Sequence, residues 1–368
     1  MTRPLRARID LGALQHNLHC TRQAAPHSRI MAVVKANGYG HGMIRVAQTL
    51  READGFGVAC LEEAISLREA GIRQPITLLE GFFDSDELEA VSHYRLMPVV
   101  HTEQQVRQLE AAQLPQPIAV WLKVDTGMHR LGFAPELFEA IHRRLQCCVN
   151  VGEIGLFSHL GYADDRRSLQ TQRQCAQFHS LLGTFPGQRS LANSGGLLGW
   201  PETQYDWVRP GLMLYGISPF AGNTGVEQGL QPVMTLASQL IAVNRYERGA
   251  AIGYSGAWVC PEDMLVGVVA AGYGDGYPRH APTGTPVLVN GKRSQLIGRV
   301  SMDMLCVDLR EQADARIGDA VVLWGADLPV EEIARCAGTI AYELVCAMAS
   351  RVPVEVLSPA PLESASAP

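Results

Sequence analysis

IMAVVKANGYGHG, residues 30–42, joins an apolar run to a lysine and three glycines. The run Met31–Val34 is typical of a buried strand, and Lys35 stands directly at its carboxyl end. Because burial disfavours an ammonium charge, a lysine in such a position is suited to form a Schiff base. Active sites of parallel barrels are built at the carboxyl ends of the strands, which makes Lys35 a candidate catalytic residue. The alternative is a lysine that reaches solvent beside a glycine-shaped turn.

Similar apolar runs follow at intervals of about 20 to 35 residues, the length of one strand plus one helix. They are FGVAC at 56–60, ITLL at 76–79, MPVV at 97–100, IAVWLKV at 118–124 and EIGLF at 153–157. A helical segment, a short run near Ser190 and the apolar LMLYGI at 212–217 come next, which brings the count close to eight. Apolar strands that alternate with helices predict a parallel sheet covered by helices. A TIM-type (β/α)8 barrel fits, and an open doubly wound sheet is the alternative.

The expected helices have recognisable starts. Asp84 or Ser85 can cap one helix, Thr102 can cap the next, and Pro135 fits the first turn of a third. Asn193-Ser194-Gly195-Gly196 opens a further helix, and its amides and serine hydroxyl make a natural phosphate cradle. An ordinary loop is the alternative for these four residues.

The sequence pattern changes after Gly229, where short predicted strands are separated by turns rich in Gly, Pro, Asn and Asp. Asn290-Gly291 is a strong hairpin signal, and the strand spacing predicts a small barrel or sandwich, hence a C-terminal mainly-β domain. GYGDGYPR at 272–279 and GRVSMDM at 298–304 indicate, each by itself, glycine turns with a polar anchor. The predicted divisions are an N-terminal strand that packs with the β domain (1–10), the barrel (11–229), the β domain (230–358) and a disordered tail (359–368).

Composition excludes several classes of protein. Of the 368 residues, 47% are hydrophobic and 18% charged, with a net charge of -6, so a large core is possible and a nucleic-acid partner is not expected. Nine scattered cysteines without a C-x-x-C pair predict reduced, mostly buried thiols and no metal site. The basic N-terminus lacks the apolar stretch of a secretory signal, and no apolar run of about 18 residues appears. We therefore expect a cytoplasmic protein without a membrane span.

Two further residues are candidates for chemistry. Arg209, ahead of Pro210-Gly211 and a buried run, needs a carboxylate, a carbonyl or a ring nitrogen as acceptor, or else forms an ordinary salt bridge. Tyr254 stands among small residues in a segment typical of an exposed loop. A tyrosine phenol ordinarily titrates near pH 10, so it needs cationic neighbours to act as a base near neutrality.

Together these segments resemble the bacterial alanine racemases, enzymes that depend on pyridoxal 5′-phosphate (PLP) and consist of a TIM-type barrel and a β domain. The resemblance extends from RIDLGALQHNL at 8–18 to YELVC at 342–346. Its motifs, in chain order, are AVVKANGYGHG, KVDTGMHRLG, NSGG, RPGLMLYG and GRVSMD. The resemblance implies interconversion of L-alanine and D-alanine, either to supply peptidoglycan precursors or to serve alanine catabolism.

The resemblance also implies a cofactor site. Its residues are Lys35, Tyr39, His159, Asn193, Ser194, Arg209, Gly211 and Tyr342. Lys35 holds PLP as a Schiff base, and Arg209 faces the pyridine nitrogen. Since a guanidinium stays protonated, it leaves that nitrogen unprotonated and the ring a weaker electron sink. Racemisation needs two bases on opposite sides of the reacting carbon. Lys35 works on the D-alanine hydrogen and Tyr254 on the L-alanine hydrogen, with His159 and Arg209 tuning the tyrosine.

Substrate recognition and assembly are implied in the same way. Arg130 and the backbone amide of Met302 bind the substrate carboxylate, while Tyr273 and Tyr342 narrow the access channel. Family members are homodimers in which the β domain of one subunit faces the barrel of the other. Tyr254 and Met302 therefore complete the site of the partner subunit.

Two positions and three rival functions stay open. Lys123 matches a lysine that is carbamylated in some members and positions the substrate-binding arginine. Ser190 stands where some members have a histidine that orients the catalytic tyrosine. The first rival is a broader-specificity amino-acid racemase of the same fold, but those enzymes carry a signal peptide. The second is a decarboxylase, which would lack Tyr254 and the GRVSMD motif. The third is a non-catalytic PLP-binding protein, which would end near residue 230.

Overall fold

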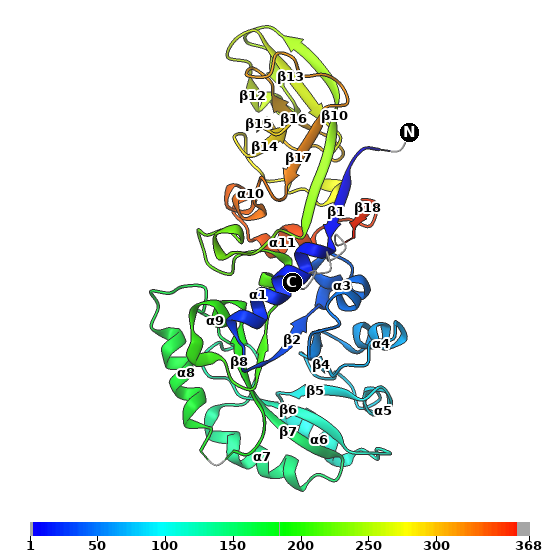
Figure 1. The fold of residues 1–368 in the computed structure, drawn as a ribbon, viewed down its shortest axis with the longest axis vertical. Helices are drawn as coiled ribbons and strands as arrows, with labels where there is room; N and C mark the ends of the chain where they lie inside the picture. The colour runs from blue at the N-terminus through cyan, green and yellow to red at the C-terminus, as the bar shows by residue number, and fades with distance from the viewer. Residues whose placement is uncertain (1–2, 184, 359–368) are drawn as a thin grey trace, which may run out of the picture. The chain divides into compact units, whose positions relative to one another are not determined.

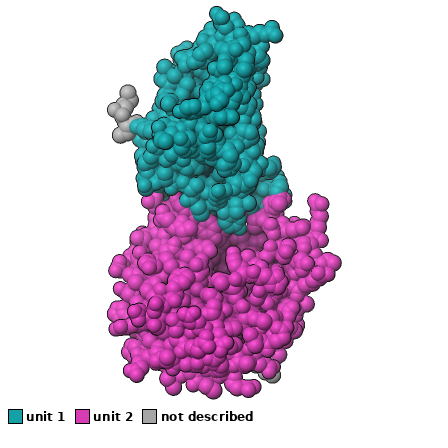
Figure 2. All heavy atoms as spheres, turned by 180° about the vertical axis from the view of Figure 1, so that it is seen from behind, with its two compact units in different colours: residues 1–16, 215–218, 222–368 teal, residues 17–214, 219–221 magenta. Residues whose placement is uncertain are grey.

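The computed structural model describes residues 3–183 and 185–358 (Figure 1). The predicted tail, 359–368, lies outside the described residues. Contacts divide the chain into two compact units (Figure 2). The β unit comprises residues 1–16, 215–218 and 222–368, and the barrel unit comprises residues 17–214 and 219–221. The boundaries predicted from the sequence differ from this division at 11–16, 215–218 and 222–229, and they stay predictions.

Eight parallel strands form the barrel unit and close on themselves in chain order (Figure 1). They are β2 (Arg29–Val33), β3 (Gly55–Val58), β4 (Ile76–Leu78), β5 (Leu96–Val100), β6 (Ile118–Lys123), β7 (Val151–Phe157), β8 (Arg189–Asn193) and β9 (Trp207–Arg209). Arg29 of β2 pairs with Trp207 of β9, which closes the ring. The TIM-type barrel is therefore confirmed, and the open sheet is excluded.

Helices alternate with these strands. They are α1 (Leu11–Ala24), α2 (Lys35–Tyr39), α3 (Met43–Thr49), α4 (Leu61–Glu69), α5 (Glu87–His93), α6 (Glu103–Ala111), α7 (Phe138–Cys147), α8 (Gln170–Ser180) and α9 (Ser194–Gly199). Thr102 caps α6 in a reciprocal capping box with Gln105, as predicted. Asn193 caps α9 by accepting a hydrogen bond from the Gly196 amide at 2.9 Å. The caps expected for α5 are wrong, because Asp84 accepts from the Asp86 amide in a turn before the helix.

Short 3₁₀ turns complete the connections. They are η1 (Pro135–Leu137), η2 (Pro201–Thr203), η3 (Leu212–Tyr215), η4 (Val226–Gln228), η5 (Tyr254–Gly256) and η6 (Tyr273–Asp275). The run LMLYGI at 212–217 is thus not the eighth strand that the sequence suggested. Its residues are buried throughout, and an apolar run that is covered on every side has no periodicity that separates a strand from a helix. The eighth strand is the three-residue β9.

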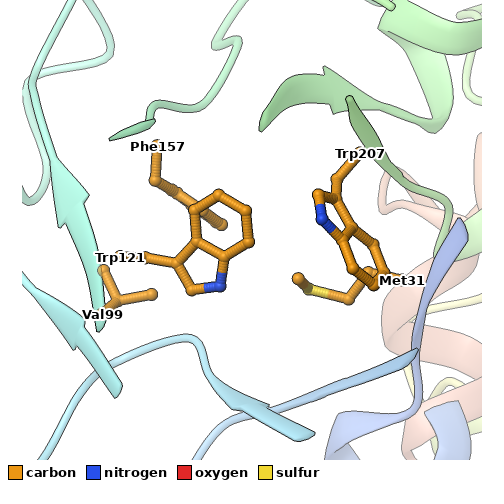
Figure 3. Close-up of a cluster of buried hydrophobic side chains, with 5 residues drawn as sticks. All are labelled: Met31, Val99, Trp121, Phe157 and Trp207. Carbon is orange, nitrogen blue, oxygen red and sulfur yellow. The ribbon is translucent and has the colours of Figure 1, made fainter. Parts of the chain in front are cut away.

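A cluster of buried hydrophobic side chains fills part of the barrel interior (Figure 3). It joins Met31, Val99, Trp121, Phe157 and Trp207, which come from five different strands. The rings of Trp121 and Trp207 meet edge to face at 6.5 Å, and Trp121 meets Phe157 at 5.9 Å. Such packing fixes the strands against one another, so their carboxyl ends form a rigid platform.

The β unit contains a sheet of eight strands in the order β13-β16-β15-β14-β17-β10-β1-β18. They are β1 (Arg6–Asp10), β10 (Met234–Tyr246), β13 (Met264–Val269), β14 (Pro286–Val289), β15 (Lys292–Ile297), β16 (Leu305–Asp308), β17 (Ala320–Trp324) and β18 (Val354–Leu357). An additional pairing of β10 with β13 closes six of these strands into a ring. The mainly-β C-terminal domain is confirmed.

Smaller elements complete the β unit. They are the two-stranded ribbon β11 (Ala251–Ile252) with β12 (Trp258–Val259) and the helices α10 (Val330–Ala337) and α11 (Ala341–Cys346). Asn290 and Gly291 have φ values of 49° and 76° and turn β14 into β15, which confirms the predicted hairpin.

Two further expectations from the sequence concern the burial of the cysteines and the absence of a membrane span. All nine cysteines are free thiols, but only Cys148 and Cys260 are buried. The expected burial of most thiols is wrong, because several lie on helices that water reaches, such as Cys147 and Cys346. Within the described part of the chain, no helix has the length and apolar character that crossing a membrane requires.

Candidate active site

Lys35 begins a tight turn directly after strand β2. Residues 36–39 have φ between 51° and 62°, in the left-handed region that costs a non-glycine residue about 1–2 kcal/mol. A carboxylate oxygen of Glu63 accepts a hydrogen bond from the Ala36 amide at 2.8 Å and helps to hold the turn. Backbone strain of this kind persists only where the surroundings impose it, and it clusters at functional sites.

Tyr39, Ser194 and Gly211 meet close to the ends of β2, β8 and β9. A Cβ atom on Gly211 would lie 2.5 Å from the Tyr39 hydroxyl oxygen, so only glycine allows this approach. The Ser194 hydroxyl oxygen accepts a hydrogen bond from the Gly211 amide at 3.0 Å. Two hydroxyl groups and bare backbone are thus gathered at one place, as the cradle of an anion requires.

Arg209 ends strand β9 and is 3% exposed. Its Nη1 donates to the Ser190 hydroxyl at 2.6 Å, and its Nη2 donates to two backbone carbonyls and to His159 Nδ1 at 3.2 Å. The guanidinium also stacks 3.8 Å from the centre of the Phe157 ring. These partners are all neutral, and no ion pair of Arg209 is found among residues 3–183 and 185–358. Burial lowers the pKa of Arg209 to about 9, so the group stays charged at neutral pH.

His159 is a neutral ring in this environment. Burial, and next the charge of Arg209, place its pKa well below the ordinary value. Because Nδ1 accepts from Arg209, the ring proton belongs on Nε2. That nitrogen lies 3.5 Å from Asn193 Nδ2, which itself donates to the Leu160 carbonyl at 3.1 Å. Arg209, His159 and Asn193 are therefore neighbours.

Lys123 ends strand β6 and is 5% exposed. Burial, followed by the charges of Arg209 and Arg130, lowers the pKa of Lys123 to about 8. Its Nζ lies 5.8 Å from the centre of the Phe157 ring, the same ring that Arg209 stacks on. A substantial fraction of the amine is therefore neutral near physiological pH.

Asp125 shapes the loop that leads to the exposed Arg130. One of its carboxylate oxygens accepts hydrogen bonds from the three successive amides of residues 127–129, at 2.9 to 3.1 Å. Although burial acts in the opposite direction, these amides hold the pKa of Asp125 below its ordinary value. A Cβ atom on Gly132 would lie 2.7 Å from the Asp125 nitrogen, so glycine lets the loop close. The loop is thus ordered by its own hydrogen bonds.

Positive charge predominates around these residues. Lys35, Lys123, Arg130 and Arg209 all act electrostatically on His159, and each lowers its pKa. Asp125 is the carboxylate whose charge raises the pKa of Lys123, and one of its oxygens is already engaged by three amides. Such a site attracts anions, and the arrangement can hold a phosphate and a carboxylate together.

The remaining predicted residues lie on the β unit. Tyr254 begins η5 and is 65% exposed, and Met302 is 53% exposed in the loop before β16. Tyr273 begins η6, and Tyr342 lies in the first turn of α11. Their meeting with the barrel residues stays a prediction.

Sequence reasoning missed two contributors to the barrel site. Asp125 was available from the pattern Asp125-Thr126-Gly127, which is typical of an aspartate that accepts from nearby amides. Phe157 gave no signal, because its position beneath Lys123 and Arg209 depends on packing between strands β6, β7 and β9.

The two halves of the chain each match a family model. The model described as alanine racemase, N-terminal domain, matches residues 9–219, and the model described as alanine racemase, C-terminal domain, matches residues 233–356. The chain belongs to the alanine racemase family. The resemblance seen in the sequence is therefore confirmed.

Individual alanine racemases match almost end to end. The biosynthetic alanine racemase of Escherichia coli O6:H1 is 53% identical over 346 residues, which cover 94% of this chain and 96% of that protein. The alanine racemase of Vibrio vulnificus strain CMCP6 is 54% identical over 345 residues, again 94% and 96% of the two chains. The crystal structure of biosynthetic alanine racemase from Pseudomonas aeruginosa superposes with a TM-score of 0.95 at 46% identity, and covers 97% of this chain and 100% of that one.

Proposed function

We propose that this protein interconverts L-alanine and D-alanine with PLP bound at the carboxyl ends of the barrel strands. The observation that carries the proposal is the group of four cations, Lys35, Lys123, Arg130 and Arg209, gathered around His159. Membership of the alanine racemase family supports the reaction, and relatives named as biosynthetic support a role in supplying D-alanine for peptidoglycan.

The barrel residues fit PLP on their own chemistry. Lys35 offers the amine for the cofactor's aldehyde, and Tyr39 and Ser194 offer hydroxyls to its phosphate beside the bare backbone of Gly211. PLP, when bound, supplies an electron sink for the bond that loses its proton. Arg209 would donate to the ring nitrogen, and because all its present partners are neutral it keeps its charge for that contact.

Other residues surround these groups. His159 and Asn193 would complete the barrel side of the cofactor site, and Tyr342 of the β unit would bind the phosphate. A protonated Arg209 would leave the ring nitrogen of a bound PLP unprotonated, and the electron sink would then be weak. A weak sink favours rapid return of the proton to Cα over other reactions.

Two bases exchange the α-proton. Lys35 holds or gives the proton on the D-alanine side, and Tyr254 does so on the L-alanine side. A tyrosine needs nearby positive charge to act as a base. Arg209 supplies this charge, and His159, which accepts a hydrogen bond from Arg209, lies between the arginine and the tyrosine in this proposal. The 65% exposure of Tyr254 supports a homodimer in which this residue enters the barrel of the partner subunit.

Substrate recognition uses the loop ordered by Asp125. Arg130 binds the alanine carboxylate together with the backbone amide of Met302 from the partner subunit. Tyr273 and Tyr342 narrow the access channel, so only small amino acids enter.

Lys123 carries a carbamate in this proposal. Its neutral amine attacks carbon dioxide, a nitrogen–carbon bond forms, and the amine loses a proton to solvent. The pKa of about 8 supports this step, because only the neutral amine is a nucleophile. The product is negatively charged and supports Arg130. Mass spectrometry of the intact protein with and without bicarbonate tests for the added group.

The cofactor and reaction are tested on purified protein. We expect the visible absorbance of bound PLP, conversion of L-alanine to D-alanine, and loss of both in Lys35→Ala. Release of carbon dioxide from an amino acid, or no reaction with alanine, contradicts the proposal. Comparable activity with serine favours the broader-specificity racemase, and bound PLP without any turnover favours the non-catalytic binding protein.

The assignment of the two bases has its own test. In Tyr254→Phe, exchange of the α-proton of L-alanine for solvent deuterium should fall much more than exchange from D-alanine. Equal losses on both sides contradict the assignment.

A further inference from the structure

We propose that Asp275 is a positioning residue for substrate binding, and that it sets the direction in which the backbone amide of Met302 points. The inference rests on the proposed function, in which that amide binds the alanine carboxylate. Asp275 belongs to the motif GYGDGYPR at 272–279, to which the proposed reaction otherwise gives only Tyr273.

Asp275 is a fully buried carboxylate that joins distant parts of the β unit. Both arms of the Arg3 guanidinium donate to it, with Nη2 at 2.7 Å from Oδ2. The Nε of Arg351 donates to Oδ1 at 2.8 Å, and the Gly272 amide donates to Oδ2 at 2.9 Å. One carboxylate thus holds two arginines from opposite ends of the chain and fixes its own loop.

The same two arginines extend to the loop that carries Met302. Arg3 Nη2 donates to the Asp303 carbonyl at 2.7 Å, and Arg351 Nη2 donates to the Asp303 carboxylate at 2.7 Å. Arg351 Nη2 also lies 3.4 Å from the Met302 carbonyl. Asp275 therefore holds the arginines that in turn hold the backbone carbonyls of Met302 and Asp303.

The loop of Asp275 also contacts this segment directly. The Tyr273 amide donates to the Ser301 carbonyl at 3.0 Å, and the Gly274 amide donates to the Met302 carbonyl at 2.9 Å. A Cβ atom on Gly272 would lie 2.4 Å from the Met302 carbonyl oxygen. Only a glycine permits this approach of two backbones, which explains the glycine at position 272.

The geometry of one peptide group links these contacts to substrate binding. The Ser301 carbonyl and the Met302 amide belong to the same planar trans peptide, so they point in opposite directions. Because Tyr273 holds the carbonyl, the Met302 N–H points away from the loop of Asp275. Among residues 3–183 and 185–358, no acceptor of this N–H is found. The amide is thus held in one direction and left open for a ligand.

A purely structural role for Asp275 is the alternative, and the chain offers a matched control. Asp308 is also a buried carboxylate of the β unit, 8% exposed, and is held by two donor groups of Arg310 at 2.7 to 3.1 Å. It ends strand β16, whereas Met302 precedes that strand. Asp308→Asn breaks a comparable network without contacts to the Met302 loop.

The test compares Asp275→Asn, Arg351→Gln and Asp308→Asn as PLP-loaded proteins. Calorimetry measures the Kd of propionate, which is alanine without its amino group and isolates recognition of the carboxylate. Kinetics measure KM and kcat for L-alanine. In Asp275→Asn and Arg351→Gln we expect the Kd of propionate and the KM for L-alanine to rise about tenfold, which is the effect expected when a hydrogen bond to a charged group is misdirected. The kcat should change much less. Asp308→Asn should keep both values within about twofold of the wild type.

Each outcome decides the inference. If Asp275→Asn does not fold, Arg351→Gln carries the test, because the Arg351 side chain is 43% exposed and Asp275 keeps Arg3 as partner. The inference is overturned if the Kd of propionate and the KM for L-alanine are unchanged in the folded variants of Asp275 and Arg351, or if they rise equally in Asp308→Asn. Racemisation of alanine by the wild type would in that case still support the proposed function. A wild type that does not racemise alanine overturns the proposed function, and the inference falls with it.

Discussion

Replacing Lys123 by methionine should stabilise the protein near neutral pH. Burial and neighbouring cations lower the pKa of Lys123 from 10.5 to about 8. The unfolded chain therefore binds this proton more tightly than the folded one, and the charged amine costs the folded state about 3 kcal/mol at any pH below 8. The cost shrinks as pH rises from 8 towards 10.5, where both states lose the proton. Methionine has a similar length and no charge, so it avoids the cost.

The measurement is urea denaturation of PLP-free protein in buffers without carbon dioxide, between pH 7 and pH 10. The free energy of unfolding of Lys123→Met should exceed that of wild type by up to about 3 kcal/mol at pH 7, and the gap should close as pH rises. Bicarbonate should narrow the gap near pH 8, because a carbamate turns the buried cation into an anion among cations. Lys292→Met, at an exposed position in the hairpin after Gly291, is the control and should show neither effect.

Two results would refute this reasoning. A variant less stable than wild type at pH 7 means that Lys123 has a partner that outweighs its burial. A gap that stays constant between pH 7 and pH 10 means that Lys123 does not titrate in this range. The variant should also lose affinity for alanine, because Arg130 then lacks the charge that the carbamate supplies.

Three further predictions concern separate contacts. Thr102→Ala removes the capping box with Gln105 and should lower the free energy of unfolding by about 1 kcal/mol, measured by urea denaturation; no change would mean that solvent caps α6 equally well. Gly211→Ala pushes Tyr39 aside and should weaken PLP binding at least tenfold in equilibrium dialysis, whereas unchanged retention would exclude Tyr39 from the phosphate site. Asp125→Ala frees the loop of Arg130 and should raise the KM for alanine about tenfold with PLP binding unchanged; an equal loss of PLP would point to collapse of the barrel site.

Local signals account for the parts of the fold that the sequence predicted. The apolar strand before Lys35, the cap at Thr102 and the Asn290-Gly291 turn each depend on neighbouring residues, so their patterns are visible in the chain itself. The 3₁₀ turn at 212–215 was mistaken for a strand because burial on every side removes periodicity.

Contacts between distant segments could not be derived in this way. Asp275 joins residues 3 and 351, and no spacing rule connects positions so far apart in the chain. Phe157 became a partner of two cations only through the packing of neighbouring strands. The barrel residues of the site could be predicted because their motifs occur in a known order, whereas the residues that support them became visible only in the fold.

Ser190 has a consequence for the pH dependence of the enzyme. Its hydroxyl accepts a hydrogen bond from Arg209 at 2.6 Å and donates one to the Trp207 carbonyl at 2.8 Å. The hydroxyl therefore acts both as acceptor and as donor. A histidine at this place, as in some family members, would change its charge within the physiological range. A serine hydroxyl does not titrate there, so Ser190 offers Arg209 the same acceptor throughout that pH range. Any pH dependence of racemisation in this protein therefore originates in groups other than Ser190, and Arg209 is one of them, because burial lowers its pKa to about 9.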